Sequence, residues 1–74
     1  MIRATDNMMA TSWQMFPLPM SRAEQADKWC VDFDGHGRFA SFTNLGLGLF
    51  YFEREIDRVA FVLVWGEYSD GSYL

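Results

Sequence analysis

Seven consecutive apolar residues, from Val59 to Trp65, constrain this chain more than any other segment. Their β-branched and aromatic types favour a strand, in which successive side chains point to opposite faces of the sheet. Phe61 would then lie on one face and Val62 on the other, so both faces need a cover. In a chain of 74 residues a helix can cover one face, but little is left for the second. The segment therefore predicts a partner surface, from a second copy or from another protein.

A single helix over residues 51–65 is the alternative interpretation of the same region. Ile56, Val59 and Leu63 have helical spacing and would share one face. Phe61 and Val62 would interrupt the polar face of that helix, and the density of valines favours a strand. We expect the strand and keep the helix as the alternative.

The length and composition predict one compact domain over residues 1–74 with a true core. Half of the residues are apolar and 18% are aromatic, which is typical of a globular fold and not of disorder. Seven Phe, three Trp and three Tyr exceed what a minimal core requires. We therefore expect some aromatic side chains on the surface, where Trp and Tyr favour interfaces.

The net charge of −4 argues against direct nucleic-acid binding, because an acidic domain repels phosphate backbones. The longest apolar run is far too short to span a membrane, and the first residues carry no apolar signal segment. Cys30 is the only cysteine, so it has no partner for an internal disulfide. These features predict a cytoplasmic protein without membrane attachment.

The expected fold class is α+β, a small antiparallel sheet of four or five strands with one short helix packed on one face. The local signals for it are a capping box at Ser21 and Glu24, a strand end at Pro17, and an Asp34-Gly35 hairpin turn. The helix is expected near 21–28, and strands near 11–16, 29–33, 38–42, 47–53 and 59–66.

One short motif resembles the opening of a calcium-binding loop. Asp32, Asp34 and His36 would fall on the first three ligand positions, but Thr43 stands where that loop needs a bidentate acid. A plain turn is the preferred interpretation and no cofactor is expected. A small metal-binding module at Asp32, Asp34 and His36 remains an alternative.

No set of residues predicts catalysis, so we expect that the protein is not an enzyme. His36 is the only histidine and lies between glycines in an expected exposed turn, with no group that orients its ring. Cys30 is expected to be a small buried side chain and not a reactive thiolate. The acids of residues 53–57 alternate with arginines, which predicts a solvated connection.

The leading functional hypothesis is a non-enzymatic protein-binding module that inhibits a macromolecular partner stoichiometrically. The small size, acidic charge and aromatic content resemble those of phage- and plasmid-encoded inhibitors, anti-CRISPR proteins among them, at the level of composition alone. The alternative is a homo-oligomeric accessory or structural subunit, most simply a homodimer. We expect a partner with a basic surface. The candidate interaction residues are Trp13, Tyr51, Val62, Tyr68 and Tyr73, with Glu53, Glu55, Glu67 and Asp70 as an acidic rim.

Overall fold

The computed structural model describes residues 1–4 and 13–68, and it folds them into a sheet with two helices. The elements follow the chain in this order: β1 (Ile2–Arg3), β2 (Gln14–Pro19), α1 (Met20–Asp32), β3 (Arg38–Asn44), β4 (Leu47–Phe52), α2 (Glu55–Trp65) and a short 3₁₀ turn (Gly66–Tyr68).

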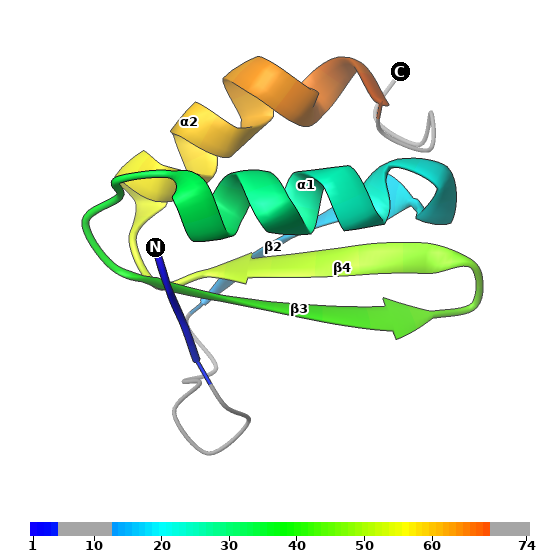
Figure 1. The fold of residues 1–74 in the computed structure, drawn as a ribbon, viewed down its shortest axis with the longest axis horizontal. Helices are drawn as coiled ribbons and strands as arrows, with labels where there is room; N and C mark the ends of the chain where they lie inside the picture. Colours follow the sequence, from blue (N-terminus) through cyan, green and yellow to red (C-terminus); the bar gives the residue numbers. More distant parts are fainter. Residues whose placement is uncertain (5–12, 69–74) are drawn as a thin grey trace.

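The four strands lie in the order β1-β3-β4-β2. β3 pairs antiparallel with β4, and β4 antiparallel with β2, whereas β1 runs parallel to β3. Both helices lie on the same face of this sheet (Figure 1). The α+β class and the strand number are confirmed. The sheet is mixed and not purely antiparallel, and a second helix joins the expected one.

Phe61 of α2 stands at the centre of the core between the helices and the sheet. Its ring centroid lies 5.8 Å from Phe16, 5.1 Å from Phe50 and 4.9 Å from Phe52, and Trp29 of α1 approaches it edge-on at 5.8 Å. The four phenylalanines of this cluster are at most 4% exposed. Much of the aromatic excess therefore serves the core.

The strand expected at 59–66 is wrong, because residues 55–65 form α2. The helical alternative is correct in type, although the helix begins four residues later than residue 51. Helical geometry points Asp57 and Phe61, one turn apart, into the protein, where both are at most 1% exposed. Burial of these two side chains outweighs the weak strand preference of the valines.

The strand expected at 29–33 is also wrong, because α1 continues to Asp32. Ala26 and Cys30 lie one turn apart on its buried face. The helix starts directly after Pro19, which makes no side-chain cap, so the expected capping box at Ser21 does not form. The hairpin expected at Asp34-Gly35 is replaced by a helix-to-strand loop.

The two strands expected at 38–42 and 47–53 are confirmed as β3 and β4. Leu45 and Gly46 connect them, with φ values of 52° and 80°. Positive φ at both positions is the geometry of a two-residue type I′ turn, whose twist matches that of the strands.

The first strand, expected near 11–16, corresponds to β2 at Gln14–Pro19, and residues 11 and 12 of the expected range lie outside the described residues. It continues through Pro17 and Pro19, so Pro17 does not end it. β2 is an edge strand of the sheet, where a residue without a backbone N–H is tolerated.

Candidate protein-interaction surface

The outer face of α2 is apolar and exposed. Ile56, Val59 and Leu63 are 58%, 47% and 81% exposed. Their spacing of three and four residues places them along one stripe, opposite the buried Asp57 and Phe61. We call Ile56, Val59 and Leu63 the α2 ridge. A helix that is apolar on both sides is normally covered on both sides.

Acidic side chains lie at the two ends of the α2 ridge. Glu55 precedes Val59 by four residues and Glu67 follows Leu63 by four, and both glutamates are exposed. Glu55 lies in the first turn of α2, where a negative charge is favourable for the helix. The ridge therefore presents an apolar centre between negative ends.

The face of the sheet away from the helices is a second apolar surface. Met15 and Tyr51 are paired across β2 and β4, and Phe42 and Leu49 across β3 and β4. Met15 is 41% and Phe42 is 36% exposed, and the Phe42 and Tyr51 rings meet edge-on at 5.8 Å. We call Met15, Phe42, Leu49 and Tyr51 the open sheet face. Neither helix of the described chain covers it (Figure 1).

The expected surface position of Trp13 is wrong. Its side chain is only 9% exposed and packs with Ala4 and Ala40 at one end of the open sheet face. Tyr51 is half-buried beside this cluster. Both aromatics thus lie on the sheet side of the molecule, away from α2.

The structure separates the other candidate residues. Glu55 and Glu67 are exposed beside the α2 ridge, whereas Val62 is half-buried and packs against the core. The side chain of Tyr68 lies outside the described residues, as do Asp70 and Tyr73.

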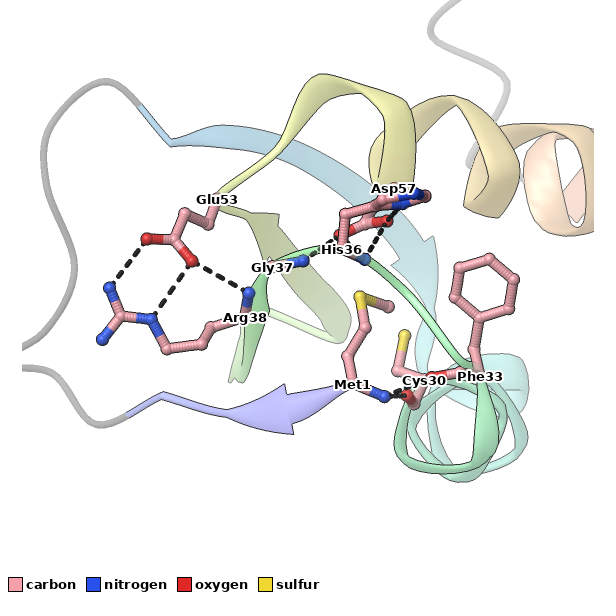
Figure 2. Close-up of polar contacts among 8 residues, drawn as sticks. All are labelled: Met1, Cys30, Phe33, His36, Gly37, Arg38, Glu53 and Asp57. Atoms are coloured by element: carbon pink, nitrogen blue, oxygen red, sulfur yellow. Dashed lines mark hydrogen bonds and ion pairs between the residues drawn. The ribbon is translucent and has the colours of Figure 1, made fainter.

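Glu53, expected in the acidic rim of an interface, is instead bonded to Arg38 of the same chain. Arg38 donates from Nη2 to Glu53 Oε2 at 2.7 Å, and from its backbone N–H and Nε to Oε1 at 3.0 and 3.1 Å (Figure 2). The side-chain bonds and then the backbone bond from Arg38 lower the pKa of Glu53 to about 2. The Arg38 guanidinium also lies over the Trp13 ring, 5.7 Å from its centroid. This pair fixes the start of β3 to the end of β4.

Asp57 is the polar group that sequence reasoning missed. Its carboxylate is 1% exposed and accepts hydrogen bonds from the backbone N–H of His36 at 2.9 Å and of Gly37 at 2.7 Å (Figure 2). The expected solvated connection is therefore wrong at this position. A Cβ at Gly35 would lie 2.9 Å from Asp57 Oδ1, so glycine permits the close approach. Asp57 fastens the loop before β3 to the first turn of α2.

The loop also places His36 beside this carboxylate. His36 Nδ1 lies 3.4 Å from Asp57 Oδ1, and the imidazole side chain is 67% exposed as expected. A buried carboxylate next to an imidazole can orient the ring, which the sequence did not indicate. Orientation alone does not make a catalytic centre, because catalysis also needs a nucleophile or charge stabiliser at the reacting atom.

Cys30 is buried in the core, as expected. Its side chain is fully covered, and burial raises the pKa of its thiol to about 12. At neutral pH the group is therefore a thiol and not a nucleophilic thiolate.

The candidate metal loop does not assemble. Asp32 ends α1, whereas His36 is turned toward Asp57. Within residues 1–4 and 13–68, no cluster of three or more His, Cys, Asp or Glu side chains is placed to hold a metal ion. At the end of α1, the amino group of Met1 donates hydrogen bonds to the carbonyl oxygens of Cys30, at 2.7 Å, and of Phe33 (Figure 2). These bonds hold the first residue of the chain against the end of this helix.

No family model, curated protein or solved structure matches this chain significantly. Within the described part of the chain, neither helix is long and apolar enough to cross a membrane.

Proposed function

We propose that this chain is a non-enzymatic protein-binding module and that the α2 ridge is its contact surface. The strongest support for the proposal is Leu63, a large apolar side chain that is 81% exposed at the C-terminal end of the apolar stripe. Exposed apolar surface gathered in one patch marks interaction sites more often than scattered single residues do. An apolar helix face laid into a groove is a recurrent mode of protein recognition.

The charges at the ends of the ridge indicate the chemistry of the partner. Glu55 and Glu67 would favour a groove flanked by lysine or arginine. If the ridges of two copies packed together, glutamates would face glutamates whether the two helices ran parallel or antiparallel. The repulsion of these like charges opposes such a dimer. A different protein with a basic rim is therefore the proposed occupant. The net charge of −4 further supports a basic protein partner and not nucleic acid.

The proposed mode of action is stoichiometric inhibition by occupying the surface of the partner. The groups that could have served catalysis have structural roles: Cys30 lies in the core, and Asp57 holds the loop that carries His36. We place the protein in the cytoplasm, since a reducing compartment suits its single buried thiol.

The test is to isolate the partner from the native host and to titrate it with purified protein. We expect the activity of the partner to fall linearly and to reach its limit at one protein per target. Glu67→Lys should weaken binding, most strongly at low salt, while Asp32→Lys at the exposed end of α1 serves as a matched charge control. Loss of target activity at protein levels far below one per target, abolished by His36→Ala, would show turnover and refute the proposal.

A homo-oligomeric subunit is the second candidate function, favoured by the open sheet face. Phe42 and Met15 are large, apolar and exposed on a face that neither helix covers. Pairing of two such faces about a two-fold axis would cover the apolar rows of both copies. This association uses the opposite side of the sheet from α2 and leaves the α2 ridge free.

A further inference from the structure

The outer edge of β3 is only partly paired. β1 pairs with Arg38 and Phe39 alone. The backbone N–H of Ala4 donates to the Phe39 carbonyl at this edge, at 2.7 Å, whereas the Arg38 carbonyl accepts from Glu53 on the β4 side. Because peptide groups alternate along a strand, the N–H and C=O groups of Ser41 and Thr43 also face the outer edge.

No described strand pairs with residues 41–44 on that edge. An edge with unpaired backbone donors and acceptors is a template for a further strand. Its outward peptide groups at Ser41 and Thr43 supply sequence-independent hydrogen bonds. Specificity needs an adjacent side-chain pocket.

A cavity of about 540 Å³ lies alongside this edge, between α1 and the β3–β4 hairpin. Ser41 and Thr43 belong to its lining, so the open edge and the cavity are adjacent. Met20, Ala23 and Phe50 give it an apolar lining. The volume is in the range of small ligand sites and is ample for one or two side chains.

The backbone of β4 approaches α1 closely beside this cavity. A Cβ at Gly48 would lie only 2.6 Å from the Ala23 Cβ, so the absence of a side chain brings the strand against the helix.

A polar network closes the cavity at the end where β1 stops. Arg3 donates two hydrogen bonds to the Asp27 carboxylate, at 2.9 and 2.6 Å, and Ser41 Oγ donates to Asp27 Oδ1 at 2.6 Å. The bonds from Arg3, followed by that from Ser41, lower the pKa of Asp27. The charge of Asp27 is thus already balanced, and Glu24 is the other acid in the lining.

We propose that the outer edge of β3 at residues 41–44 binds an extended peptide of a partner protein as a fifth strand, with an apolar side chain in the adjacent cavity and a lysine or arginine against Glu24. Side chains two residues apart share one face of a strand. The preferred peptide therefore carries an apolar residue and a basic residue separated by one position. This site is distinct from the α2 ridge and does not depend on it.

The experiment selects peptides from a phage-displayed library of random octapeptides on the immobilised full chain. We expect enrichment of the apolar-x-basic pattern over the unselected library, and micromolar binding of the corresponding synthetic peptide. Thr43→Pro removes one outward N–H and should weaken binding at least about tenfold. Thr43→Ala keeps that N–H and should therefore bind several times more tightly than Thr43→Pro.

Hydrogen exchange of the backbone amides in the wild-type protein tests the same proposal and does not depend on the folding of a variant. The selected peptide should slow exchange at Ser41 and Thr43. No enriched pattern, equal binding to Thr43→Pro and Thr43→Ala, or slowed exchange only along α2 would overturn the proposal. Slower exchange at Ser41 and Thr43 on raising the protein concentration without peptide would assign the edge to a second copy and also overturn it.

Discussion

At the residue scale, three neighbouring acids that look alike in the sequence have three different environments. Glu53 is paired with Arg38, Glu55 is exposed, and Asp57 is buried. The partners of Asp57 are backbone N–H groups about twenty residues earlier in the chain. Backbone donors have no signature in the sequence. The exposure of His36 could be predicted from its flanking glycines, but its carboxylate neighbour could not.

Replacement of the buried carboxylate tests its structural role. Asp57→Asn leaves the backbone N–H groups of His36 and Gly37 facing an amide, and we expect a loss of about 2–3 kcal/mol in the free energy of unfolding. Glu55→Gln, at an exposed site in the same turn, should cost about 0.5 kcal/mol or less. Urea unfolding of both variants measures the difference. Equal small losses would show that Asp57 does not fasten the loop.

The Glu53–Arg38 pair predicts a specific acid dependence of stability. The pKa of Glu53 in the folded protein, about 2, lies below its ordinary value of 4.5, so the ionised form favours folding. This contribution is complete above the ordinary pKa and is lost as the pH falls through the folded pKa. The melting temperature of the wild type should exceed that of Glu53→Gln above pH 5, and the gap should close toward pH 2. A gap that is constant over this range would contradict the assigned pKa.

At the scale of elements, short-range alternation predicted β3 and β4 correctly, whereas the ends of both helices could not be read locally. Residues 29–33 alternate well enough for a strand, but Ala26 and Cys30 already form a helical stripe that continues through them. Residues 59–65 are all apolar, so the sequence shows neither the alternation of a strand nor the spacing of a helix with one polar face. The helix is favoured over the strand because it lets Phe61 pack with aromatic rings from strands that are distant in the sequence.

The two apolar faces of α2 can be distinguished by truncation. Phe61→Ala should cost about 3–5 kcal/mol in the free energy of unfolding, because it empties the centre of the core. Leu63→Ala should change it by about 0.5 kcal/mol or less, since this side chain is largely exposed. Chemical denaturation of the two variants compares them. In a strand, residues 61 and 63 would share one face, so similar losses for both variants would refute the helix.

At the scale of the whole molecule, two helices cover one side of the sheet and two apolar surfaces remain. The sequence indicated that a chain of this size cannot cover all of its apolar residues, and this prediction is consistent with the exposed Leu63 and Phe42. The sequence prediction placed the uncovered apolar surface on the strand expected at residues 59–66. The structure instead divides it between the outside of α2 and the far face of the sheet. Trp13 and Val62, which the sequence indicated as interaction residues, are therefore buried and half-buried in the structure.

The open sheet face predicts self-association that is independent of α2. At tens of micromolar, we expect sedimentation at twice the monomer mass for the wild type and for Leu63→Lys. Phe42→Lys places a charge in the apolar row and should sediment as a monomer. A clean monomer for the wild type would remove the homo-oligomeric candidate and leave the α2 proposal untouched.

If the α2 ridge holds a protein partner, a substitution in the ridge should release that partner in affinity capture from the native host. Leu63→Lys alters the most exposed residue of the α2 ridge, and Leu45→Lys makes the same change at a hairpin residue that is 93% exposed. We predict one protein that the wild type and Leu45→Lys retain in equal molar amount and that Leu63→Lys loses at least about tenfold. Equal retention of every captured protein by both lysine variants would show that the α2 ridge does not bind a partner.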